Sequence, residues 1–168
     1  FRAIVKGENG YDVTVKSGIE NFCDSIEQAV PGCRASVRAL FDLVEKCKEA
    51  LDYITKMKGK PNRLVMALKH GDFMRVASHS VEEVMIGLGI PEKARNIICT
   101  YWGYLGVPTD ELNALHFLNM LYSYVTKGAA MPYMRSHELS LSLCKVIQDA
   151  GGQIWYNSEV TEFLYNDE

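Results

Sequence analysis

The longest regular pattern in the chain is RASVRALFDLVEKCKEALDYITKM, residues 34–57. Its apolar side chains recur every three or four residues, so they fall on one face of a helix: Val37, Leu40, Phe41, Val44, Cys47, Leu51 and Ile54. Residues 58–62, which include a glycine and a proline, end the pattern. We therefore expect the core to form around a long amphipathic helix over 34–57.

Two shorter helices are predicted from the spacing of a capping box, in which a serine precedes a glutamate by three residues. Ser17 and Glu20 have this spacing before a helix that reaches Val30 and ends at a Pro-Gly pair. Ser80 and Glu83 repeat it before a helix that Gly89 closes. Both serines are therefore expected to cap a helix with their side chains.

Three more helices are predicted in the second half of the chain. One extends from Pro91 to about residue 105, and another from about 110 to 126 behind Thr109 as its cap. A third spans about 136–150 and is stopped by two glycines. Residues 64–73 show no clear pattern of either kind.

Strand patterns stand at both ends of the chain. Residues 1–6 and 11–15 flank an Asn9-Gly10 turn, as in a β-hairpin, because both residues tolerate the positive φ of a tight turn. Residues 153–156 and 160–165 also have strand composition. The predicted fold class is α+β, predominantly helical with an N-terminal β-hairpin and C-terminal strands, in a single domain over 1–168.

The composition excludes several classes of protein. The chain has 168 residues, is 48% hydrophobic and carries a formal net charge of −3, so no basic field attracts nucleic acid. No apolar run approaches the roughly 20 residues needed to span a bilayer. The five cysteines are widely spaced and read as reduced core residues, which predicts a cytoplasmic protein. The chain begins at Phe1 without methionine, which we interpret as a piece of a longer polypeptide.

Motifs that carry chemistry are not found in this sequence. It contains neither GxGxxG nor GxxxxGK[ST] for phosphate binding, and no HExxH or clustered Cys/His spacing for a metal. Glu82 and Glu83 next to His79 are better explained as charges favoured in the first turn of a helix. The sequence therefore predicts no catalytic residue and no metal ligand.

Aromatic and methionine side chains are the remaining candidates for a site. They gather around residues 101–104 and 122–134 and could line a substrate pocket: Tyr101, Trp102, Tyr104, Tyr122, Met131 and Tyr133. Ordinary core or interface packing is the alternative, because aromatic residues at helical spacing are common in cores.

The last forty residues resemble a known family. They comprise the loop GAAMPYMRS over 128–136, a helix ending in Gly151-Gly152, the segment Gln153-Ile154 and then Val160-Thr161-Glu162-Phe163. This order is similar to the phytoene desaturase and carotenoid isomerase branch of FAD-dependent, amine oxidase-like oxidoreductases. The segment Tyr101-Trp102-Gly103-Tyr104 and the preceding helices resemble the substrate side of those enzymes.

The resemblance implies a role without chemistry of its own. The helical part would cover an apolar or amine substrate above the isoalloxazine ring, and Val160 would reach the FAD adenine through its backbone. FAD would bind only in the full-length protein, and its partner would be the remaining FAD-binding domain of the same polypeptide. The dinucleotide fingerprint is missing, so the chain would be a middle fragment that is inactive alone. The family usually has paired glycines where this chain has Arg135-Ser136.

A different class of function is also compatible with the sequence. The chain could be a helical protein–protein interaction module without a redox role. An apolar face left by a missing partner could also promote self-association. The full open reading frame discriminates the two hypotheses, since the flavoenzyme requires a strand-GxGxxG-helix unit upstream of Phe1.

Overall fold

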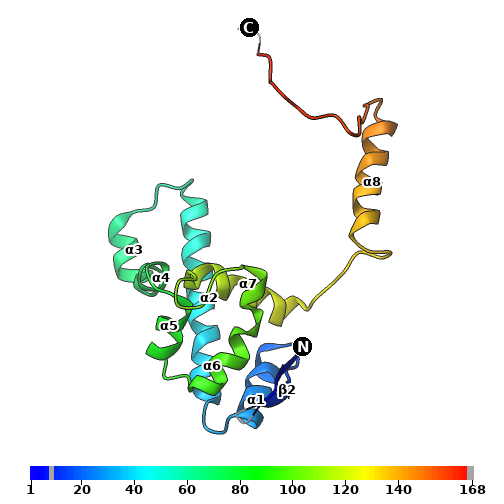
Figure 1. The fold of residues 1–168 in the computed structure, drawn as a ribbon. Coiled ribbons are helices and arrows are strands. Elements are labelled where there is room, and N and C mark those ends of the chain that lie inside the picture. Colours follow the sequence, from blue (N-terminus) through cyan, green and yellow to red (C-terminus); the bar gives the residue numbers. More distant parts are fainter. Residues whose placement is uncertain (8–9, 166–168) are drawn as a thin grey trace. The chain divides into compact units, whose positions relative to one another are not determined.

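The computed structural model describes residues 1–7 and 10–165, and its contacts divide the chain into two compact units. The first unit is Phe1–Gly128 and the second is Ala129–Glu168. Figure 1 shows the helices of both units. The single domain predicted over 1–168 stays a prediction.

Strands β1 (Arg2–Val5) and β2 (Tyr11–Thr14) form an antiparallel hairpin in the first unit. Arg2 pairs with Thr14, and Val5 pairs with Tyr11. The strands predicted over 1–6 and 11–15 are therefore confirmed, while Asn9 of the predicted turn lies outside the described residues. Val5 remains exposed on this hairpin, which matters for the site.

Helix α2 (Arg34–Lys56) is the central element of the first unit and confirms the long helix predicted over 34–57. It packs against α1 (Ile19–Ala29), α4 (Gly71–Ala77) and α7 (Ala114–Lys127) (Figure 1). Its apolar face is buried from Val37 to Ala50. The rings of Phe22 and Phe41 meet edge to face between α1 and α2, with centroids 5.3 Å apart.

The start of α1 differs from the predicted capping box. Gly18 is the N-cap residue, and no side chain caps the helix, so the predicted role of Ser17 is wrong. Glu20 forms ion pairs with Arg34 and Arg38 of α2. These pairs between the two helices replace the local bond that a capping box requires.

Residues 63–87 form three short helices: α3 (Arg63–Lys69), α4 and α5 (Val81–Gly87). The stretch without a clear pattern is thus helical, and the side chain of Asn62 caps α3 by accepting from the amide of Leu64. The capping box of α5 is confirmed. The Glu83 amide donates to Ser80 Oγ over 3.2 Å, and the Ser80 amide donates to Glu83 Oε2 over 2.9 Å.

The helix predicted over 91–105 is α6 (Glu92–Ile98), continued by the 3₁₀ helix η1 (Cys99–Tyr104). The next helix, α7, begins at Ala114 and not near 110 as predicted. The carbonyls of Thr109 and Leu112 accept the amides of Glu82 and Val81. Residues 109–112 are therefore fixed against the start of α5, which delays the helix until Asn113 caps it.

The second unit contains α8 (Ser136–Asp149), close to the predicted helix over 136–150. The C-terminal strands predicted over 153–156 and 160–165 are not formed, since residues 150–165 of the described chain contain no strand. A strand needs a neighbour to bond its backbone N–H and C=O groups. The N-terminal hairpin still makes the chain α+β and predominantly helical, as predicted.

The cysteines are free, and three of them, Cys23, Cys33 and Cys47, are buried in the core of the first unit. Cys99 and Cys144 are half-buried. Of the helices that the structure describes, none is both long enough and apolar enough to cross a bilayer.

Candidate functional site

An aromatic cluster lies where the hairpin, η1 and α7 meet. The ring centroid of Tyr101 is 4.2 Å from that of Phe1, 5.4 Å from Tyr124 and 6.4 Å from Tyr104. The centroids of Tyr104 and Tyr124 are 5.3 Å apart. We use the name aromatic cluster for Phe1, Tyr101, Tyr104 and Tyr124.

Local structure explains why these rings gather. A 3₁₀ helix repeats every three residues, so Tyr101 and Tyr104 stand on the same side of η1. Tyr124 follows the buried Leu121 by one turn of α7 and lies beside the same core. Pairing of β1 with β2 brings Phe1 to the cluster, because the Phe1 amino group donates to the Val15 carbonyl over 2.8 Å.

The hydroxyl groups of Tyr101 and Tyr124 are held in their neutral form. Burial raises the pKa of Tyr101 to about 12. A hydrogen bond with Tyr104 raises the pKa of Tyr124. Near pH 7 the cluster therefore offers ring faces and neutral hydroxyls, which can bind and orient an apolar or weakly polar molecule but do not act as bases.

Trp102 lines a cavity of about 470 Å³, whose lining contains none of the four residues of the aromatic cluster. Val5 and Tyr11 of the hairpin line one side, and Cys99 and Asp110 also border it. Burial raises the pKa of the Cys99 thiol to about 12, so this thiol remains protonated and apolar. The size fits a small organic group, and the wall mixes apolar side chains with polar ones such as Asn96 and Thr109.

Tyr122 is one of the predicted pocket residues, but it lies outside the aromatic cluster and does not line the Trp102 cavity. Its ring lies under Lys48, whose Nζ is 4.2 Å from the ring centroid. Its hydroxyl donates to Glu45 Oε1 over 3.5 Å. Tyr122 therefore links α7 to α2, which is the packing role expected as the alternative to lining a pocket.

Met131 and Tyr133 belong to the second unit, in the segment before α8. They are 76% and 91% exposed. Val160 also belongs to the second unit and is exposed. Within the described residues its backbone forms no hydrogen bond, which leaves its N–H and C=O groups accessible.

Of the predicted site residues, the structure brings Tyr101 and Tyr104 together in the aromatic cluster, whereas Trp102 lines the cavity of about 470 Å³. It adds Phe1, Val5 and Tyr124, which are absent from the predicted set. The position of Tyr124 on the buried face of α7 was a usable signal. Phe1 and Val5 could not be assigned, because they reach the site through strand pairing.

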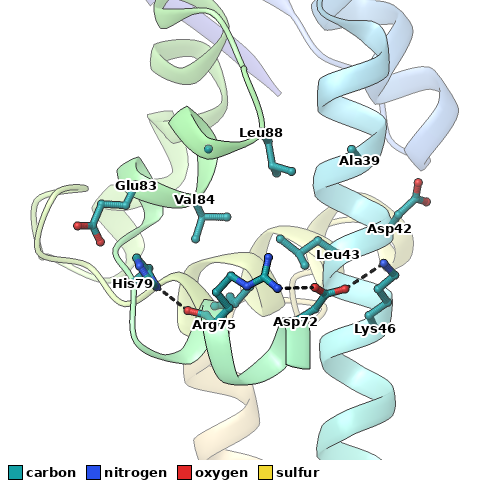
Figure 2. A pocket seen from close by; sticks show the side chains of 12 residues that line it. Ala39, Asp42, Leu43, Lys46, Asp72, Arg75, His79, Glu83, Val84 and Leu88 are labelled. Atoms are coloured by element: carbon teal, nitrogen blue, oxygen red, sulfur yellow. Dashed lines mark hydrogen bonds and ion pairs between the residues drawn. The ribbon is translucent and has the colours of Figure 1, made fainter. Parts of the chain in front are cut away.

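A second cavity of about 500 Å³, which sequence patterns do not indicate, lies between α2, α4 and α5. Figure 2 shows its apolar side chains Leu43, Val84 and Leu88 above the charged groups of Asp72 and Arg75 (Figure 2). We call it the α2/α4/α5 pocket. Its residues share one face of each helix, but they are spread in sequence from Ala39 to Leu88.

Metal binding finds no support in the described ranges 1–7 and 10–165. No group of three His, Cys, Asp or Glu residues there has the spacing to hold an ion. His79 Nδ1 lies 2.6 Å from the Arg75 carbonyl, and Glu83 caps α5. Both side chains thus have structural partners.

Comparison with known proteins gives no assignment. A scan against family models, a search of curated proteins and a search of solved structures each returned no match.

Proposed function

We propose that the chain is the substrate-binding cap portion of an FAD-dependent oxidoreductase related to phytoene dehydrogenases. The observation that carries this proposal is the second unit. Its helix α8 buries none of its residues, although it carries several large apolar side chains, Leu139, Leu141, Leu143, Val146 and Ile147. Amphipathic helices gain their stability by covering such a face.

The segment after α8 has the same property. Residues 153–165 form no strand in the described structure, yet they carry exposed Trp155, Phe163 and Leu164. In the proposal, an FAD-binding domain of the same polypeptide covers α8 and provides the strand partner that this segment needs. The bare backbone of Val160 fits a contact with the FAD adenine.

The backbone before α8 offers further support. Arg135 has φ 79° and ψ 177°, a region that glycine adopts without strain and other residues rarely do. The resembling family has a glycine pair at this place. The chain thus retains a glycine-like backbone although the glycine is replaced.

The first unit would supply the substrate wall in this proposal. The aromatic cluster and the Trp102 cavity would orient an apolar or amine substrate, while bound FAD would supply the redox chemistry. No acid or base is required from the neutral tyrosines. We place the protein in the cytoplasm in this proposal, in keeping with five free cysteines.

The alternative function, a helical interaction module, is favoured by the same exposed face of α8. The two functions differ in what covers that face. A flavoenzyme covers it within one polypeptide that carries a strand-GxGxxG-helix unit, whereas an interaction module needs a separate protein.

Flavin content tests the proposal. The 168-residue chain, titrated with FAD and followed by its visible absorbance, is expected to bind no stoichiometric flavin. The polypeptide encoded by the complete open reading frame is expected to purify with one FAD and to lose it when Leu143→Gln and Ile147→Gln are combined. Stoichiometric FAD on the short chain, or none on the complete one, contradicts the proposal.

A further inference from the structure

The α2/α4/α5 pocket is separate from the aromatic cluster and is not used by the proposed function. Its walls come from three helices of the first unit, with Leu43 on α2, Val76 on α4 and Val84 and Leu88 at α5. All four are buried or half-buried and belong to or pack against the core. A volume of about 500 Å³ lies within the range of small-molecule sites.

Most charges at the rim of the pocket are already paired. Lys46 Nζ donates to Asp72 Oδ2 over 3.0 Å, and Arg38 Nη2 lies 3.1 Å from Asp42 Oδ1. Glu83 accepts the amide of Ser80 at the start of α5. These carboxylates have partners, so they do not impose a cation on the pocket.

Arg75 is the exception. Its Nη2 is 4.0 Å from Asp72 Oδ1, too far for a hydrogen bond, and its guanidinium makes no other hydrogen bond within the described residues. Figure 2 shows the guanidinium directed towards Asp72, to which a dashed line joins it, with Val84 and Leu88 above it. The Arg75 side chain is 77% exposed and its pair with Asp72 is long, so its N–H donors can bond a negatively charged group at the mouth of the pocket.

His79 has a compatible arrangement next to Arg75. Its Nδ1 is 2.6 Å from the Arg75 carbonyl oxygen, so Nδ1 carries the proton and donates. This bond fixes the ring at the rim and leaves Nε2 for a ligand. It also ties the imidazole to the helix that presents the guanidinium.

We propose that the α2/α4/α5 pocket binds an amphipathic carboxylic acid, whose aliphatic chain lies against Leu43, Val84 and Leu88 and whose carboxylate pairs with Arg75. A planar carboxylate matches the guanidinium fork with two parallel hydrogen bonds. A single negative charge is favoured over two, because Asp72 and Glu83 border the same space. The apolar floor holds the chain by burial from water.

Octanoate, octylammonium and octanol are suitable probes, since they share a chain length and differ in charge. Each is titrated at pH 7 into the 168-residue chain, and binding is followed by amide shifts in two-dimensional NMR spectra. Octanoate is expected to saturate shifts of Val84 and Leu88 and to bind more tightly than the other two. Arg75→Gln should weaken octanoate about tenfold and leave octanol unchanged. Lys127→Gln, a change of an exposed cation on α7, serves as the charge control.

Filling the pocket tests its location. Gly87 borders the pocket, has open space at its Cβ position and has no positive φ, so Gly87→Leu should fold and abolish octanoate binding. Gly71→Leu is the matched control, because Gly71 also has open space and lies in a helix outside the pocket. Circular dichroism checks both folds. The proposal is overturned by octylammonium binding as tightly as octanoate, by no saturable octanoate shift, or by unchanged binding in Arg75→Gln or Gly87→Leu.

Discussion

At the scale of single residues, the two serines predicted to cap helices differ in their structural role. Ser80 exchanges two hydrogen bonds with Glu83 and is buried at the start of α5. Ser17 is exposed, and Gly18 takes the N-cap position of α1. The same spacing of serine and glutamate therefore forms a stabilising capping box at Ser80 but not at Ser17.

Substitution of the two serines by alanine measures this difference. Ser80→Ala leaves the Glu83 amide without its acceptor and should lower the free energy of unfolding by about 1 kcal/mol. Ser17→Ala removes no capping bond and should change it by less than about 0.5 kcal/mol. Urea denaturation of both variants gives the two values. Equal losses would show that Ser17 caps α1 in solution.

At the scale of elements, sequence patterns predict helices better than their ends. The apolar stripe of α2 is strong enough that its predicted and observed limits agree within one residue. The start of α7 was predicted too early, because the backbone of 109–112 bonds to the start of α5, a contact between segments far apart in sequence. The C-terminal strands failed for a related reason, since pairing depends on a neighbour and not on composition.

The candidate site shows the same limit. Tyr101 and Tyr104 share one side of a 3₁₀ helix, a local property that a sequence displays. Phe1 joins them only through the β1–β2 register, which also brings Val5 to the Trp102 cavity. The α2/α4/α5 pocket requires three helices to meet. Long-range contacts of this kind leave no local signature.

The exposed face of α8 gives a prediction at this scale. Leu143 of α8 is 58% exposed, whereas Leu121 of α7 is 1% exposed. In the 168-residue chain, Leu143→Ala should change the free energy of unfolding by less than about 0.5 kcal/mol. Leu121→Ala should lower it by roughly 2–5 kcal/mol, because it creates a cavity in the core. Urea denaturation followed by tryptophan fluorescence compares them, and a loss above about 1 kcal/mol for Leu143→Ala would show that α8 is covered.

At the scale of the whole molecule, the core of the first unit holds thiols in their protonated form. Burial raises the pKa of Cys23 and of Cys47 from 9.0 to about 11 in each case. It raises the pKa of Cys99 to about 12. These thiols come from α1, α2 and η1, so burial in the core as a whole makes the stability of the folded chain depend on alkaline pH.

Alkaline titration should therefore destabilise the fold before the folded thiols ionise. Between about pH 9 and 11 the unfolded chain loses thiol protons that the folded chain keeps, so the free energy of unfolding falls as pH rises. Because Cys47→Ala removes one of these thiols, the stability gap between wild type and this variant should be largest below pH 9 and shrink towards pH 11. Urea denaturation at pH 7, 8, 9 and 10 measures the gap. Leu121→Ala removes no titrating group, so its difference in stability from wild type should stay constant with pH and serves as the control. If the difference for Cys47→Ala is equally constant, or widens with pH, water reaches the thiol in the folded core.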